Sequence, residues 1–189
     1  NIDVWMRKAI EEELIPGPRF APSGREICGA GGLMDWNPDH LKLGMEGIIQ
    51  LVNGPVETRA AVRSLAKNGV EWVKTYPSGD AASPHADQHS LCMTFEELQA
   101  ASEEAHNYKM KITGHCRSAQ SIKNAVRAGF DAVEHATFID GEALDLLLAR
   151  NVPVVPGLVF ERTSIDRGPE FGLPEACIAG HRETLDGGI

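Results

Sequence analysis

The sequence contains no apolar run approaching the ~20 residues that a membrane-spanning helix needs. It has no basic stripe either, because acidic side chains outnumber basic ones and the formal net charge is −9. These two shortages argue against a membrane or a nucleic-acid partner, since phosphate groups are held by clustered Lys and Arg. The four cysteines form no CxxC pair and no signal peptide is evident. We therefore expect reduced thiols in the cytoplasm, with a secreted precursor as the alternative.

Several common catalytic signatures are also missing. No GxGxxG or P-loop sequence opens a helix, which argues against the nucleotide-binding version of an α/β fold. No Gly-x-Ser-x-Gly element is present, and no cysteine stands in a recognisable motif with a histidine. The composition is otherwise ordinary, with 42% hydrophobic and 24% charged residues, so the 189 residues can bury one sizeable core.

What the sequence does contain is a pair of histidines at the ends of two short apolar segments. His115 follows Lys-Ile-Thr-Gly, and His135 follows Asp-Ala-Val-Glu. Residues 119–129 between them have the apolar spacing of one amphipathic helix. Because all strand exits of a parallel sheet lie at one edge, we expect the two imidazoles side by side, as a natural metal clamp. Glu134 should point to the opposite side of its strand from His135 and should not bind metal.

Strand-like and helix-like segments alternate along the chain. The pattern predicts helices over 4–14, 55–69, 94–107, 119–129, 140–150 and 175–186. It predicts strands over 19–22, 72–75, 110–113, 131–134 and 152–156. The remaining segments read as a glycine-rich turn and irregular loop over 27–44, a polar loop over 78–90, and either a strand or a packed loop over 48–52. Such alternation is typical of an α/β protein with a parallel sheet, either a TIM-type barrel or a doubly wound fold.

Lys74 lies near the exit of the predicted strand 72–75. It could be a lysine that extends from the edge of the sheet with its amine in water. Alternatively, it is buried with a reactive amine that attacks either a carbonyl substrate or CO2. The carbamate formed with CO2 is a carboxylate on a long stem, which can bridge two divalent ions. The ions would then compensate the buried negative charge.

Two further side chains near these strands could contact a substrate. Arg117 stands two residues past His115, where its planar fork could bind a substrate carboxylate. A surface salt bridge is the alternative for this arginine. Tyr76, two residues past Lys74, is a second candidate for binding substrate.

The other histidines carry weaker signals. His85 and His89 are separated by four positions, but Pro84 and the polar composition favour solvated loop residues over a helical metal site. His40 follows Asn-Pro-Asp in a loop, from which contact with a substrate is the less favoured interpretation. His106 is expected on the surface of a helix, and His181 is likewise helical.

Taken together, these residues resemble the metal-dependent amidohydrolase superfamily, in its imidazolonepropionase-like and prolidase-like branch. The segments that carry the likeness are 7–24, Gly31-Gly32, Val73-Lys74 with Gly79, Gly114-His115, and Val133 to Ala136. The resemblance covers essentially the whole chain and implies a single domain, 1–189, that is an incomplete (β/α)8 barrel of the TIM type. The implied segment is strands three to seven, with strands one, two and eight absent.

The resemblance implies a chemistry for the strand-end residues. Lys74, as its carbamate, would bridge two divalent metal ions, with zinc the expected metal. His115 and His135 would bind the second ion. The implied reaction is hydrolysis of an amide, peptide or cyclic-amide C–N bond in a small molecule or dipeptide, through a hydroxide that attacks the carbonyl.

The sequence also departs from the family pattern. It contains no His-x-His pair, which the family has at its first strand, and no segment matches the eighth strand with its aspartate. Leu33 stands where the family has a histidine after Gly-Gly. An open barrel segment exposes two sheet edges, so we expect self-association into a homo-oligomer. Two alternatives stay open: a catalytically inert barrel segment, and a barrel enzyme that uses Lys74 to form a Schiff base.

Overall fold

The computed structural model describes residues 1–37, 40 and 48–187. Its centre is one six-stranded sheet in the order β2-β1-β3-β4-β5-β6, and every neighbouring pair is parallel. The predicted α/β class with a parallel sheet is therefore confirmed. The strands are β1 Glu26–Gly29, β2 Ile49–Val52, β3 Trp72–Thr75, β4 Lys111–Ser118, β5 Ala132–Phe138 and β6 Val154–Val155.

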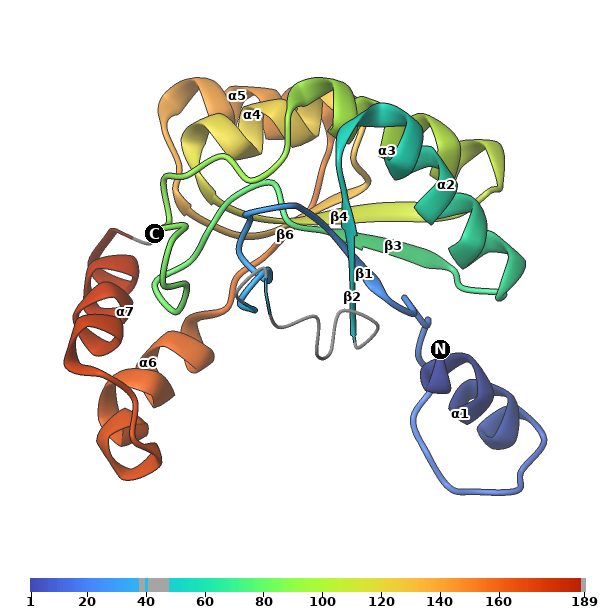
Figure 1. Ribbon diagram of the computed structural model, residues 1–189, viewed down its shortest axis with the longest axis horizontal. Helices are drawn as coiled ribbons and strands as arrows, with labels where there is room; N and C mark the ends of the chain where they lie inside the picture. Colours follow the sequence, from blue (N-terminus) through green and yellow to red (C-terminus); the bar gives the residue numbers. More distant parts are fainter. Residues whose placement is uncertain (38–39, 41–47, 188–189) are drawn as a thin grey trace.

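The helices cover the two faces of the sheet unequally. Helices α2 to α5 lie side by side on one face, whereas α1 and the pair α6–α7 extend from the other side at opposite ends of the molecule (Figure 1). The open face between these two arms is the one that carries the site described below. The helices are α1 Ile2–Glu11, α2 Gly54–Lys67, α3 Phe95–Asn107, α4 Ala119–Ala128, α5 Gly141–Arg150, α6 Leu158–Arg167 and α7 Glu175–Gly187, with a 3-10 turn at Gly168–Phe171.

Local sequence signals set the helix boundaries next to the strands. Thr94 accepts a hydrogen bond from the Glu97 backbone, and the Glu97 carboxylate accepts one from the Thr94 backbone, which is a complete capping box for α3. The side chains of Ser118 and Asp140 each accept one backbone hydrogen bond at the start of α4 and α5, and each such cap contributes ~1 kcal/mol. Gly129 ends α4 in the left-handed region, at φ 91°. These caps fix the points at which β4 and β5 pass into their helices.

Alternation along the strands separates the core from the open face. Val73, Ile112 and Val133 are fully buried between the sheet and its helices. Lys74 follows Val73, and His115 stands three positions after Ile112. Both therefore point to the opposite, open face. The chemistry-bearing residues thus stand on the rigid inner strands of the sheet.

The structure corrects the prediction for the first strand. Residues 19–22 form no strand, and β1 lies at Glu26–Gly29, inside the segment that reads as a glycine-rich turn. Ile27 and Cys28 are fully buried there. A Cβ at Gly29 would collide with the carbonyl oxygen of Cys92, so this glycine serves close packing and does not mark a turn.

The sheet has one strand more than the five-strand segment predicted from the resemblance. The segment 48–52, for which strand and loop were both open, forms β2 and pairs with β1. Strands β4 and β5 also continue several residues past the predicted ends. Helix α6 was not predicted, because its apolar residues do not gather on one side of the helix. Pro156 and Gly157, which precede it, also indicate a turn. The part of the 27–44 loop at 38–39 and 41–44 lies outside the described residues.

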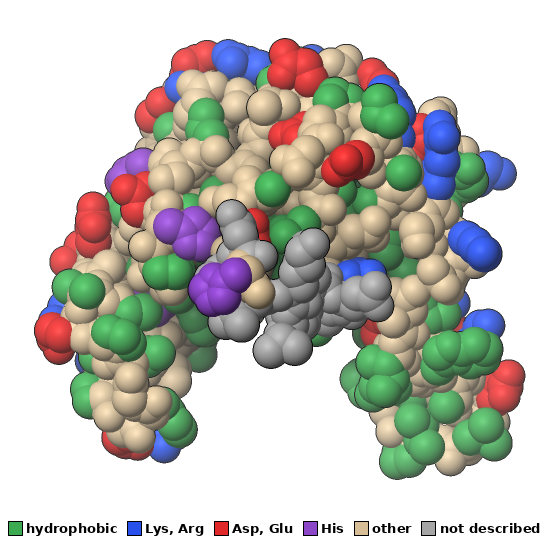
Figure 2. Space-filling model, viewed as in Figure 1, with side chains coloured by type: hydrophobic (Ala, Val, Ile, Leu, Met, Phe, Trp, Pro, Cys, Tyr) green, Lys and Arg blue, Asp and Glu red, His purple; other side chains and the backbone are tan. Residues whose placement is uncertain are grey.

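Apolar side chains are exposed on both arms of the molecule (Figure 2). Trp5 of α1 is 68% exposed, and Val159 of α6 is 81% exposed. In the part of the chain that the structure describes, no helix combines the length and the apolarity needed to cross a membrane. The cytoplasmic location and the self-association stay predictions.

Candidate functional site

All five residues that were predicted from the sequence as site residues line one cavity on the open face of the sheet. Lys74 and Tyr76 come from the end of β3, His115 and Arg117 from β4, and His135 from β5. The cavity has a volume of about 330 Å³. Its apolar wall consists of Leu33, Met34, Trp36 and Phe160. The strand order predicted from the two histidines thus brings the expected groups together, while their functional roles stay predictions.

The two histidines lie side by side. Their ring centroids are 4.5 Å apart and the rings meet edge to face. His115 faces Glu134 across the strand pair, and His135 faces Cys116, so strict alternation would send the two imidazoles to opposite faces. His135 and Ala136 instead have φ of 69° and 52°, in the left-handed region, where the strand register shifts. This irregularity rotates His135 to the face that already carries His115.

The same irregularity overturns the expectation for Glu134. Its carboxylate forms an ion pair with Lys74 Nζ and accepts a hydrogen bond from Thr113 Oγ1 at 3.3 Å. Glu134 therefore lies on the site face, because its own position obeys alternation and His135 is the residue that departs from it. The Lys74 side chain is only 11% exposed, so it is not a lysine extending from the sheet edge into water.

His115 is held from behind by two acceptors. Its Nε2 lies 3.2 Å from the carbonyl oxygen of Gly79 and 3.2 Å from Asp80 Oδ2. Neither group can donate, so Nε2 must carry the hydrogen. Burial lowers the pKa of His115, against the opposing effect of Asp80, and the neutral ring therefore presents Nδ1 as its lone-pair nitrogen.

His135 has no such support. Its Nδ1 is buried and has no hydrogen-bond partner among the described residues. Burial, together with the neighbouring His115, lowers its pKa to about 2, so the ring is neutral. A Cβ on Gly157 would lie 2.8 Å from this nitrogen, which shows how closely the backbone approaches the ring. Buried polar atoms without partners are rare in native proteins, so this one calls for a physical explanation.

Arg117 is the centre of a buried ionic network. Its Nε donates to Asp80 Oδ2 at 2.8 Å, Nη1 to Thr137 Oγ1 at 3.0 Å, and Nη2 to Glu161 Oε1 at 2.5 Å. The other oxygen of Glu161 lies 2.7 Å from His181 Nδ1. Arg117 is 2% exposed, so the surface salt bridge considered for it is wrong. The network joins β4 and the 78–90 loop to α6 and α7.

Asp80 is strongly ionised in this network. Burial favours its neutral form, but the hydrogen bond with His115 and the positive charge of Arg117 outweigh burial and hold its pKa well below the usual range. A carboxylate between an arginine and a histidine is thus a fixed negative charge in the wall of the cavity.

The remaining histidines divide as follows. His40, His85, His89 and His106 are exposed, as expected for solvated or surface residues. His181 is 1% exposed and pairs with Glu161, so its helical position is confirmed but it is not a surface residue.

Sequence reasoning missed Asp80, Glu161 and Glu134. Asp80 lies in the loop that follows the Lys74 strand, the kind of loop from which barrel proteins place site residues. That position was the available signal for Asp80. No sequence signal indicated a role for Glu161, because the helix that carries it, α6, was not predicted.

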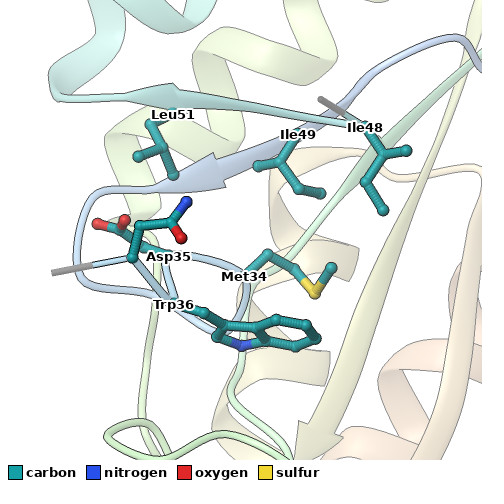
Figure 3. Close-up of a pocket in the computed structure, with 7 residues that line it drawn as sticks. Met34, Asp35, Trp36, Ile48, Ile49 and Leu51 are labelled. Carbon is teal, nitrogen blue, oxygen red and sulfur yellow. The ribbon is translucent and has the colours of Figure 1, made fainter. Parts of the chain in front are cut away.

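An apolar cleft adjoins the cavity, with Met34 and Trp36 contributing to both (Figure 3). In this view the Met34 side chain lies between the Trp36 ring and the side chains of Ile48 and Ile49 (Figure 3). The indole Nε1 donates to the Leu33 carbonyl, which orients the ring. On the other side of the cavity, the Tyr76 hydroxyl donates to Glu26. The cavity thus contains the polar side chains, and the adjoining cleft adds an apolar surface beside them.

The residues present are consistent with a metal ion. Two neutral imidazoles share one wall of the cavity with the Lys74 amine, and the buried His135 Nδ1 is unpartnered. A buried imidazole nitrogen without a partner is compatible with a ligand site, and here that nitrogen lies against Gly157. Within residues 1–37, 40 and 48–187, however, no group of three or more His, Cys, Asp or Glu side chains is placed to hold a metal. The site therefore fits the metal in part, through the two imidazoles and the lysine.

Comparison with known proteins gives one matching family and several relatives. A family model described as the amidohydrolase family matches residues 2–172. The ochratoxinase of Aspergillus niger is 26% identical over 136 residues, which cover 72% of this chain and 28% of that protein. An uncharacterized protein of Mycobacterium tuberculosis is 29% identical over 100 residues, covering 53% of this chain and 26% of that protein.

Solved structures give the same picture over nearly the whole chain. A prolidase in complex with N-methylphosphonate-L-proline has a TM-score of 0.90 at 28% identity, covering 97% of this chain and 47% of that one. A Xaa-Pro dipeptidase with bound methionine has a TM-score of 0.83 at 28% identity, with 97% and 46% covered. The chain thus spans about half the length of these structures and about a quarter of the curated relatives. The predicted fold class, an incomplete barrel of the TIM type, is confirmed.

Proposed function

Since this chain belongs to the amidohydrolase family, we propose that the complete protein is a metal-dependent hydrolase of amide or peptide C–N bonds in small substrates. The observation that supports this most directly is the cavity in which Lys74, His115 and His135 meet, with the buried His135 Nδ1 unpartnered. Prolidase and Xaa-Pro dipeptidase are among the solved relatives, so a dipeptide ending in proline is the substrate we test first.

The metal would be held by the two imidazoles and by Lys74 as its carbamate, with zinc as the proposed ion. A bound zinc ion polarises a substrate carbonyl and lowers the pKa of water. Carbamate formation would convert the ion pair of Lys74 with Glu134 into two neighbouring negative groups, which only a cation can hold together. Lysine modification and metal binding are therefore coupled in this proposal.

The cavity walls would position the substrate. Leu33, Trp36 and Phe160 offer an apolar surface for its side chain and reduce the access of water to the polar centre. Tyr76, whose hydroxyl is engaged by Glu26, would present its ring to the substrate as a fixed wall. We therefore propose a preference for dipeptides with an apolar first residue.

The role considered for Arg117 needs revision. Its guanidinium already donates to Asp80, Thr137 and Glu161. A substrate carboxylate would meet a cation that two buried carboxylates neutralise. We propose that Arg117 organises the site from behind and does not recognise substrate.

The direct test measures zinc binding and hydrolysis by the purified chain. We expect zinc binding by equilibrium dialysis, a carbamate carbon signal in ¹³C NMR after ¹³CO2 is supplied, and release of proline from an apolar-residue–proline dipeptide. Lys74→Ala should remove the carbamate signal, and His135→Ala should weaken zinc binding. The exposed His106→Ala is the matched control and should change neither.

Two outcomes would contradict the proposal. Absence of zinc binding and of turnover would support the inert-segment alternative. Trapping of a carbonyl substrate on Lys74 by borohydride, without a metal requirement, would support the Schiff-base alternative.

A further inference from the structure

Asp80 and the backbone of Gly79 form a rigid support behind His115. Gly79 N donates to the Ser90 carbonyl at 3.1 Å, and Asp80 N donates to the Ala86 carbonyl at 3.0 Å. A Cβ at Gly79 would collide with the backbone of Ala86 and Asp87. The loop is therefore closely packed on itself, and Ser78 ties it to β4 by accepting a hydrogen bond from Arg117 N at 2.8 Å and donating one to the His115 carbonyl at 3.2 Å.

The Asp80 carboxylate is itself fixed by three donors. Oδ2 accepts from Arg117 Nε at 2.8 Å and lies 3.2 Å from His115 Nε2, while Oδ1 accepts from the Ala82 backbone at 3.2 Å. Arg117 is held in turn by Glu161. Two of these donors, Arg117 and the Ala82 backbone, hold the carboxylate independently of His115.

This arrangement decides which nitrogen of His115 is free. A neutral imidazole has one donor and one acceptor. With hydrogen on Nδ1, the Nε2 lone pair would face both the Gly79 carbonyl and the Asp80 carboxylate, and all three would repel one another. With hydrogen on Nε2, that nitrogen can donate to either acceptor. Among the described residues, nothing hydrogen-bonds His115 Nδ1, while the ring lines the cavity.

The geometry points to Asp80 as a positioning residue that fixes His115 in the Nε2–H tautomer and leaves Nδ1 as its metal-facing atom. The part of this inference that concerns metal rests on the proposed function; the tautomer does not. Histidine ligands are commonly oriented by a carboxylate or carbonyl on the opposite nitrogen, and removal of such a group costs about 10- to 100-fold in metal affinity.

The test uses histidine NMR on the metal-free, ¹⁵N-labelled chain. Long-range ¹⁵N–¹H correlations distinguish the protonated from the unprotonated ring nitrogen, and a His115→Gln variant assigns the signal. We expect the wild-type His115 as the Nε2–H tautomer alone. Asp80→Asn should give a mixture, because an amide can either accept from or donate to Nε2 and only the Gly79 carbonyl still favours one form. Asp80→Glu, which keeps an acceptor, should restore the wild-type tautomer at least in part.

Glu104→Gln is the matched control. It also removes the charge of a buried carboxylate that pairs with arginines, Arg59 and Arg63, but it belongs neither to the cavity nor to the network of Arg117. It should leave the tautomer unchanged and zinc affinity near wild type, whereas Asp80→Asn should weaken zinc binding by about 10- to 100-fold. If both variants shift the tautomer equally, Asp80 has only a structural role and the inference fails.

The wild-type spectrum tests the tautomer of His115 even if Asp80→Asn does not fold. A His115 signal with hydrogen on Nδ1 overturns the inference at once. A wild-type chain with the Nε2–H tautomer that binds no zinc would instead contradict the proposed function and leave the tautomer assignment standing.

Discussion

The two histidines of the site are close neighbours in opposite circumstances. The nitrogen of His115 that faces away from the cavity meets two acceptors, whereas the buried Nδ1 of His135 meets none among the described residues. His115 also stands on a regular part of β4, while His135 has the left-handed backbone of a strand irregularity. The difference shows that one imidazole is oriented before any ligand arrives, and the other depends on what binds in the cavity.

The surroundings explain this asymmetry. β4 is backed by the 78–90 loop and by the buried network of Arg117, which brings charged groups to within hydrogen-bonding reach. Next to β5, the backbone of Gly157 approaches the His135 ring, and no side chain of the described residues hydrogen-bonds its Nδ1. The predictions below disturb the surroundings of one histidine or the other, and the pH series titrates both.

The largest effect is expected from Arg117→Ala. The change leaves Asp80 and Glu161 as buried carboxylates without their cation, which typically costs ~3–5 kcal/mol of stability. Urea unfolding followed by circular dichroism would measure it. The control is Arg127→Ala, because Arg127 is half exposed and pairs with the exposed Glu142, and it should cost less than ~1 kcal/mol. Equal losses in the two variants would show that the network does not support the fold.

A second comparison replaces each histidine by leucine. His115→Leu removes one donor from the Gly79 carbonyl and from the Asp80 carboxylate, and the loss of a hydrogen bond to a charged group should cost ~1.5–3 kcal/mol. His135→Leu removes a polar atom that has no partner, so the free energy of unfolding should change by less than about 1 kcal/mol. Urea unfolding of both metal-free variants checks the order. A larger loss for His135→Leu would mean that its ring has a structural partner in solution.

The third prediction concerns pH. The folded-state pKa of His135 is lowered from 6.5 to about 2, so its contribution to stability is complete above pH 6.5 and declines as pH falls below that value. His115 acts in the same direction. We expect the chain to lose on the order of 1 kcal/mol between pH 7.5 and 5.5, measured by urea midpoints. His135→Leu should show a shallower dependence over this window, and an unchanged slope would contradict the assignment.

At lower pH a different group takes over. The pKa of Asp80 is held below its ordinary value of 3.8, so the stability that this carboxylate contributes is present above that pH and is lost as pH falls further. The loss of stability should therefore begin below pH 6.5 and become steeper below pH 3.8 in the same unfolding series.

The smallest effect is expected from Gly157→Ala. The added Cβ would lie 2.8 Å from His135 Nδ1, so the ring must move, while φ of −103° at this position accepts alanine. We expect zinc binding to weaken a few-fold in dialysis with little change in melting temperature. Gly141→Ala is the control, because a Cβ there has no atom within 4 Å. If zinc binding is unchanged, the ring has room that the structure does not show.

The sequence was sufficient for the elements that carry local signals. The Thr94 capping box predicted the start of α3, and residues 72–75 became β3 as expected. The strand-helix-strand order also put His115 and His135 at one exit edge, and the backbone irregularity at His135 brings both rings to one face.

What could not be predicted depends on contacts between distant residues. The partners of Arg117, Asp80 and Glu161, are separated from it by 37 and 44 positions, and no local pattern indicates such pairing. The position of Glu134 was misjudged because alternation assumes a regular strand, and the left-handed backbone of His135 is a tertiary outcome.

The link between Arg117 and Glu161 makes the position of α6 and the orientation of His115 parts of one equilibrium. Thermodynamic coupling of this kind is reciprocal. A ligand that selects the oriented form of His115 will tighten the docking of α6 through Asp80 and Arg117. Any partner or solvent condition that separates α6 from the sheet will lower the affinity for that ligand by the same factor.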